Sequence, residues 1–93
     1  MKIKYSPQVN NINNVSYSFK GDIITAIVDG QTDTFDFSSM SNDSVATEIE
    51  SSLLVKVITM ASKDENGELW VTLFKPITSN ATEAECFPVW ENV

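Results

Sequence analysis

The chain has 93 residues, enough for one small domain, and its composition of 42% hydrophobic and 20% charged residues is too apolar for a disordered chain. Six lysines and no arginine or histidine oppose thirteen carboxylates, so the formal net charge is -7. This balance argues against nucleic acid and against an anionic membrane surface as partners, because phosphate binding needs a Lys/Arg cluster.

The N-terminal residues predict a strand followed by a loop. Residues 1–5 alternate in polarity and are expected to form a short edge strand, with Ile3 and Tyr5 on one face and the two lysines on the other. Lysines on an edge strand discourage pairing between sheets. Residues 6–14 are rich in asparagine and contain one proline, which predicts a loop.

Residues 15–37 predict an antiparallel meander of three strands. Gly21-Asp22 and Asp29-Gly30 are expected to be two-residue hairpin turns. These turns fix the register, which makes one face apolar and the other rich in serine and threonine. The expected cross-strand pairs are Phe19 with Ile24, Tyr17 with Ala26, Val15 with Val28, and Ile24 with Phe35.

Residues 43–53 predict one short helix. Apolar residues recur there at four-residue spacing, and Asp43 or Ser44 can cap the first turn. The recurring residues are Val45, Ile49 and Leu53. A single further helical turn is predicted over residues 82–85, before Pro88.

Residues 54–63 and 68–75 predict a second hairpin around Asn66-Gly67, a dipeptide that favours a type I′ turn. That turn would pair Met60 with Leu73. The residues then expected on the core face are Leu54, Ile58, Met60, Leu69, Val71 and Leu73. The residues expected on the opposite face are Thr59, Ala61, Lys63, Trp70, Thr72 and Phe74.

These elements together predict a mainly β fold, with α+β as the alternative class. We expect one domain over residues 1–93, built on a small antiparallel sheet of about five strands with one short helix. The meander and the second hairpin supply the strands of that sheet.

The residue types disfavour an enzyme and a metal site. Without histidine, serine or cysteine catalysis lacks its usual general base, and one cysteine cannot form a thiolate cluster for zinc. Asp29, Asp33 and Asp36 lie near one end of the meander, where two carboxylates could act as an acid/base pair or bind a cation. A turn explains Asp29 better and a solvated strand face explains Asp36 better, whereas the register places Asp33 beside Ala26 on the apolar face at the end of its strand. The run 64–68 has its glycine too early for a calcium loop. We therefore expect no catalytic, cofactor-binding or metal-binding residue.

The C-terminal segment 86–93 carries two large aromatic residues, Phe87 and Trp90. Such residues either dock on the domain's own sheet or are offered to a partner, because aromatic side chains dominate protein interfaces. We expect the segment to dock on the sheet. The residues expected to contribute to a protein contact surface are Phe87, Trp90, Trp70 and Phe74.

Turn motifs and aromatic residues recur from the meander to the C-terminal segment. They are Gly21-Asp22, Ile24, Ala26, Asp29-Gly30, Thr32-Asp33, Phe35 to Ser38, Glu65 to Gly67, Leu69, Val71, Leu73, Ala81 to Glu83, Phe87-Pro88 and Trp90. This pattern resembles small uncharacterised prophage proteins of Gram-positive bacteria, which are often encoded near phage tail genes. The Phe-Pro-x-Trp motif carries most of the resemblance.

The resemblance implies a phage-associated structural, assembly or accessory protein that acts through a phage structural protein or through self-association. Two alternatives stay open: an acidic inhibitor or mimic that occupies a basic site on a host protein, and a small ligand-binding module or enzyme that uses the carboxylates. The single Cys86 and the absence of an apolar N-terminal core predict a reducing interior without secretion by signal peptide. The resemblance implies that this location is the bacterial cytoplasm or the virion.

Overall fold

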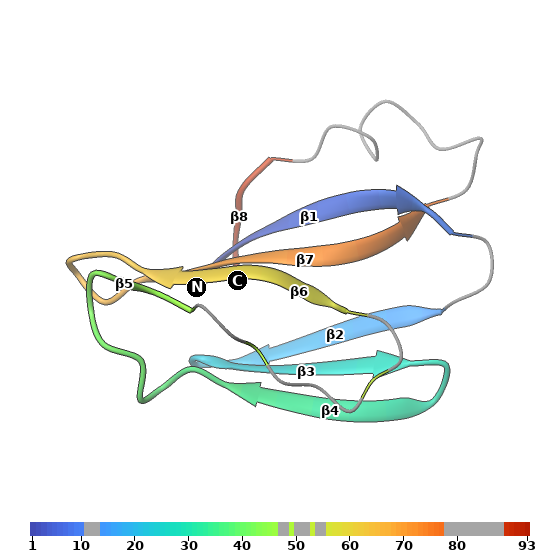
Figure 1. Ribbon diagram of the computed structural model, residues 1–93, viewed down its shortest axis with the longest axis horizontal. Helices are drawn as coiled ribbons and strands as arrows, with labels where there is room; N and C mark the ends of the chain where they lie inside the picture. The colour runs from blue at the N-terminus through green and yellow to red at the C-terminus, as the bar shows by residue number, and fades with distance from the viewer. Residues whose placement is uncertain (11–13, 47–48, 50–52, 54–55, 78–88) are drawn as a thin grey trace.

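The structure is a computed structural model that describes residues 1–10, 14–46, 49, 53, 56–77 and 89–93. In these residues the protein is mainly β and contains no helix. The strands are β1 (Lys2–Val9), β2 (Val15–Lys20), β3 (Ile23–Val28), β4 (Gln31–Asp36), β5 (Ser44–Val45), β6 (Ile58–Lys63), β7 (Leu69–Ile77) and β8 (Glu91–Asn92). They form a five-stranded sheet in the order β5-β6-β7-β1-β8 and a three-stranded sheet in the order β2-β3-β4 (Figure 1).

The predicted meander is confirmed as the three-stranded sheet. All four expected cross-strand pairs are present, including Tyr17 with Ala26 and Ile24 with Phe35. Asp29 and Gly30 both have positive φ, at 50° and 84°, as a type I′ turn requires. The alternation of side chains in these short, tightly connected strands was therefore sufficient to define their register.

The first strand differs from the prediction in length and in neighbours. β1 extends to Val9, so residues 6–9 of the predicted loop belong to a strand. β1 pairs in parallel with β7 along its whole length, and β8 pairs antiparallel with Lys2 and Ile3 on its other side. The expected edge strand is therefore flanked on both sides at its start. A parallel neighbour far along the chain leaves no local turn signal in the sequence.

The second hairpin forms, but its predicted type I′ turn and register are wrong. In this turn only Gly67 has positive φ, at 81°, and its N–H donates to the carbonyl oxygen of Asp64. A type I turn followed by a left-handed glycine adds one residue to the loop. Ala61 consequently lies opposite Val71, and Met60 lies opposite Thr72 where Leu73 was predicted.

The changed register reverses the faces of β6. Ala61 is fully buried and the side chain of Lys63 is 6% exposed, whereas Met60, expected in the core, is 49% exposed. An irregularity between Ile58 and Met60 then returns Ile58 to the interior, opposite Leu73.

The described part of the predicted helix over residues 43–53 begins as a strand. Ser44 and Val45 form β5 and pair with Lys63 and Ser62 of β6. The Ala46 N–H continues this pairing to the carbonyl oxygen of Ala61. Most of residues 47–55 and the turn predicted over residues 82–85 lie outside the described residues.

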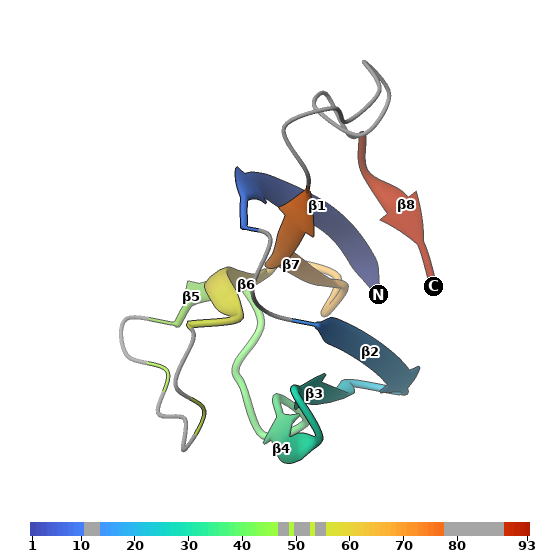
Figure 2. The same cartoon turned by 90° about the vertical axis from the view of Figure 1, so that its right-hand side faces the viewer.

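The core lies between the two sheets, which Figure 2 shows as separate layers. Its buried residues are Ile3, Ile24, Ala26, Val28, Phe35, Leu53, Val57, Ile58, Ala61, Leu69, Val71 and Leu73. Two polar contacts also cross between the layers: Lys63 pairs with Asp22, and the Tyr17 hydroxyl donates to the carbonyl oxygen of Phe74. Burial raises the pKa of Tyr17, which keeps this hydroxyl protonated as a donor.

Candidate functional site: an aromatic surface on the five-stranded sheet

Trp70 and Trp90, two of the predicted contact residues, lie together in space. Their ring centroids are 5.1 Å apart and the rings meet edge to face at 80°. Trp70 belongs to β7, and Trp90 directly precedes β8. Both strands flank β1, so one tryptophan reaches the other across that strand.

The register of β1 explains why the two rings share a face. Lys2 lies opposite Trp70 of β7 and opposite Asn92 of β8. Trp90 is two residues before Asn92, and residues two apart on an extended chain point to the same side. Lys4, likewise two residues after Lys2, places its Nζ 5.8 Å from the centroid of the Trp90 ring.

Asp64 holds Trp70 in place from the hairpin turn. Its Oδ2 accepts a hydrogen bond of 3.0 Å from the indole Nε1 of Trp70, and its Oδ1 accepts from the backbone N–H groups of Asn66 and Glu68. The bond from Trp70, with those from the backbone, lowers the pKa of Asp64 and keeps it ionised at neutral pH. The indole orientation is therefore set by the same carboxylate that organises the turn.

Met60 and Val45 extend the apolar character of this face. Met60 is 49% exposed, Val45 is 62% exposed and Trp90 is 38% exposed. We call these three residues together with Trp70 the aromatic surface. Sequence reasoning missed Met60 because the assumed turn was one residue too short, and it missed Val45 because that residue was assigned to a helix.

The other two predicted contact residues do not join the aromatic surface. Phe87 lies outside the described residues. Phe74 is 3% exposed, and its backbone is engaged on both sides, by Val57 through the N–H and by Tyr17 through the carbonyl. Phe74 is therefore an interior residue of this chain, so the aromatic surface does not include it.

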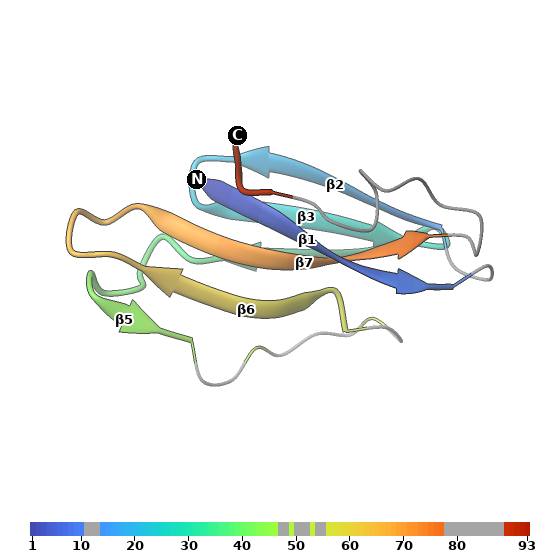
Figure 3. The same cartoon turned by 90° about the horizontal axis from the view of Figure 1, so that it is seen from above.

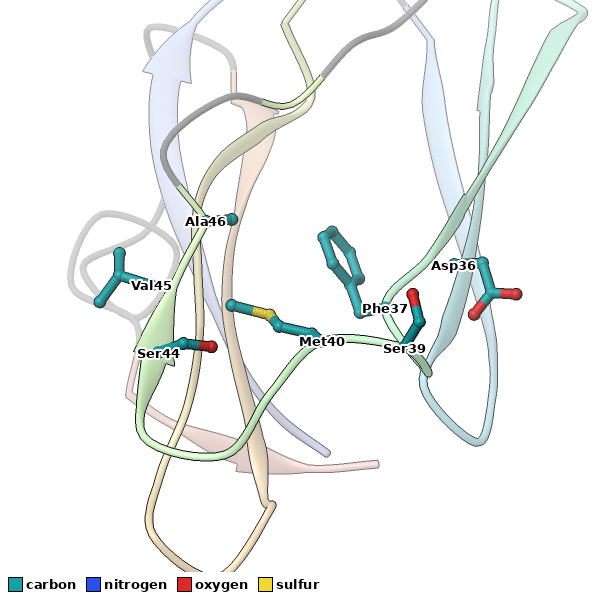
Figure 4. Close-up of a pocket in the computed structure, with 7 residues that line it drawn as sticks. All are labelled: Asp36, Phe37, Ser39, Met40, Ser44, Val45 and Ala46. Atoms are coloured by element: carbon teal, nitrogen blue, oxygen red, sulfur yellow. The ribbon is translucent and has the colours of Figure 1, made fainter.

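A groove of about 410 Å³ lies between the end of β4 and β5 (Figure 4). Phe37 and Met40 point into it, whereas the side chain of Val45 points away. Two of its polar side chains bond within the adjoining loop: Asp36 accepts from the Ser38 N–H at 2.9 Å, and the Ser44 hydroxyl donates to the carbonyl oxygen of Ser41. The residues that line it are Asp36, Phe37, Ser39, Met40, Ser44, Val45 and Ala46.

The three aspartates considered as an acid/base or cation site serve local backbone instead. Asp29 accepts from the Asn14 N–H at 2.8 Å, Asp33 from the Thr34 N–H at 2.9 Å, and Asp36 from Ser38. The bond from Ser38, helped by the nearby Lys63, lowers the pKa of Asp36. Within the described ranges, no three His, Cys, Asp or Glu residues are grouped so that they could hold a metal ion.

Comparison of the chain with protein-family models, with curated proteins and with solved structures gives no match. In the part of the chain that the structure describes, no helix has the length and hydropathy needed to cross a membrane.

Proposed function

We propose that this chain is a non-catalytic protein that binds another protein through its aromatic surface. The observation that carries the proposal is the Trp70–Trp90 pair, held edge to face on an exposed sheet face that also carries Met60 and Val45. Tryptophan and methionine are enriched at protein interfaces, where they bury large apolar areas.

The aromatic surface is also preorganised. Trp70 is held by Asp64, and Trp90 packs on Trp70 beneath the Lys4 ammonium group. Side chains that are already ordered lose less conformational entropy when a partner covers them. A fixed pair of tryptophans is therefore better suited to an interface anchor than two freely rotating rings.

The resemblance to prophage proteins supplies the biological setting of the proposal. We infer a phage-associated structural, assembly or accessory role, exerted through a phage structural protein. The net charge of -7 supports a second candidate, an acidic inhibitor that occupies a basic site on a host protein. The two candidates differ in the partner that the chain captures.

The test is affinity capture from a lysogen lysate with three purified forms of the chain: the native sequence, Met60→Lys, and Ile27→Lys. Ile27 lies on the outer face of the other sheet and is 40% exposed, so its replacement is a matched control for adding one lysine to a sheet. We expect capture of phage structural proteins by the native chain and by Ile27→Lys, and its loss with Met60→Lys.

Other outcomes would overturn parts of the proposal. Equal capture by all three forms would remove the aromatic surface as the binding site. Capture of a basic host protein, weakened by high salt, would favour the acidic inhibitor instead. Saturable binding of a small metabolite with no protein captured would favour a ligand-binding module.

A further inference from the structure

The two outer strands of the three-stranded sheet differ in how their edges are protected. The outer edge of β4, on the side away from β3, is protected against pairing with a further strand. The type I′ turn makes Val28 and Gln31 a hydrogen-bonded pair, so residues 32, 34 and 36 direct their backbone groups away from β3. The outward Thr34 N–H is already taken by the carboxylate of Asp33, at 2.9 Å. Charged side chains along an edge oppose the addition of another strand.

β2 presents the opposite situation. The turn at Gly21-Asp22 makes Lys20 and Ile23 a hydrogen-bonded pair. Every second pair from there is also hydrogen-bonded, and the bond from the Asp29 N–H to the Asn14 carbonyl oxygen fits this pattern. The residues between them that direct backbone groups outward are Val15, Tyr17 and Phe19.

No described strand pairs with this outer edge of β2. In Figure 3, β2 lies on the upper side of the view, above β3. The strand contains no carboxylate, and its one charge, Lys20, lies at its end. The sequence VSYSFK has high β propensity, which favours pairing with a further strand. This edge also lacks the carboxylates that protect the edge of β4.

We propose that β2 pairs with β2 of a second copy of this chain, antiparallel and around a two-fold axis at Tyr17. In this register Tyr17 faces Tyr17 of the second copy, and Val15 faces Phe19. Each of these is a hydrogen-bonded pair, so the outward N–H and C=O groups of all three residues find partners. The two three-stranded sheets become one continuous sheet through an isologous interface.

Charge favours this register. It places Lys20 opposite Asn14 of the second copy and Ser16 opposite Ser18, so no like charges meet. Pairing β4 with β4 would instead add the carboxylates Asp33 and Asp36 of both copies to one shared edge and would displace the bond from Thr34 to Asp33. The partner that the open edge fits best is therefore its own copy.

The test is the mass of the full chain in solution, measured by light scattering and by sedimentation from micromolar to millimolar concentration. The native chain is expected to form a dimer. In the double variant Ser16→Lys with Ser18→Lys, like charges face each other twice, which should raise the dissociation constant by about tenfold or more. The double variant Ser16→Glu with Ser18→Lys places opposite charges there and should remain a dimer.

Two further variants separate this interface from other contacts. Thr32→Lys with Thr34→Lys adds the same charge to the β4 edge and should leave the dimer unchanged. In a Cys86→Ser background, a mixture of Ser16→Cys and Ser18→Cys chains should form an interchain disulfide more readily than either alone, because those positions face each other. A native chain that stays monomeric, or equal effects of the two Ser16 and Ser18 double variants, would overturn the proposal.

The dimer and the proposed partner binding can fail independently. The β2 edge and the aromatic surface belong to different sheets. Loss of the dimer with intact capture of a partner would contradict only the β2 interface, and loss of capture with an intact dimer would contradict only the proposed function.

Discussion

Lys63 and Asp22 form an ion pair that joins the two sheets, with Nζ 3.1 Å from Oδ2. The Lys63 side chain is 6% exposed and the Asp22 side chain 32% exposed. Lys63 points inward because the hairpin register turns it to the face of Ala61, and Asp22 lies in the turn between β2 and β3. An ammonium group this deeply buried depends on its carboxylate partner.

We expect the two partners of this pair to respond differently to substitution. Asp22→Ala leaves Lys63 buried without its partner and should lower the free energy of unfolding by about 1–3 kcal/mol. Lys63→Met removes the charge and keeps much of the apolar volume, so it should be nearly neutral. Urea denaturation of both variants is the measurement, with the exposed Lys20→Met as control. Equal losses for Asp22→Ala and Lys63→Met would contradict this account.

The register of the second hairpin predicts opposite effects at two adjacent residues. Ala61 is fully buried and Met60 is 49% exposed. Ala61→Lys should therefore destabilise the protein by more than about 3 kcal/mol, because it buries an unpaired charge. Met60→Lys should change the free energy of unfolding by no more than about 0.5 kcal/mol. If the type I′ register applied instead, the larger loss would come from Met60→Lys.

Asp64 should make stability depend on pH. Its pKa in the folded protein is lowered by the hydrogen bonds from Trp70 and from the turn backbone. A lowered carboxyl pKa contributes stability above the unfolded value, near 3.8, and that contribution is lost as pH falls through the folded value. Denaturation midpoints between neutral pH and about pH 2.5 should thus fall less steeply in Asp64→Asn than in the native chain.

The control for this pH effect is Glu65→Gln, which removes a charge from the same turn without removing the acceptor of the Trp70 N–H. It should keep the steeper dependence of the native chain. A native-like slope in Asp64→Asn would show that Asp64 does not couple folding to protonation.

The Trp70–Trp90 contact predicts an energetic coupling between β7 and the C-terminal segment. Edge-to-face aromatic pairs contribute about 0.5–1.5 kcal/mol beyond burial of their area. A double-mutant cycle with Trp70→Leu and Trp90→Leu should therefore give a coupling free energy of that size by chemical denaturation. Additive losses would mean that the two rings stabilise the fold independently.

Gly67 requires a backbone conformation that other residues adopt at a cost. Its φ is 81°, and an added Cβ would lie 3.0 Å from Oδ1 of Asn42. Gly67→Ala should cost about 1–2 kcal/mol by thermal or urea unfolding. Gly30→Ala meets a similar φ, at 84°, with no atom within 4 Å, so it measures the backbone cost alone. An unchanged unfolding midpoint for Gly67→Ala would contradict the left-handed conformation of Gly67 in this turn.

The candidate site was predictable only in part. The size and position of Trp70 and Trp90 were enough to select them as contact residues, and they do lie together. Met60 was assigned to the core because the dipeptide Asn66-Gly67 predicts a type I′ turn. In the observed turn the carboxylate of Asp64 instead accepts hydrogen bonds from two backbone N–H groups of the loop. A side-chain acceptor can thus select a loop one residue longer than the dipeptide implies.

The sequence by itself determined the meander and its register, from Val15 to Asp36, because its strands are neighbours in the chain and short turns connect them. Period-two alternation and left-handed turn residues encode such contacts locally. Only the tertiary structure decided that β1 lies in parallel beside β7 and that β8 brings Trp90 to Trp70. The pairings of β1 join segments separated by most of the chain, and they form because burying a shared apolar face outweighs the entropy lost in closing a long loop.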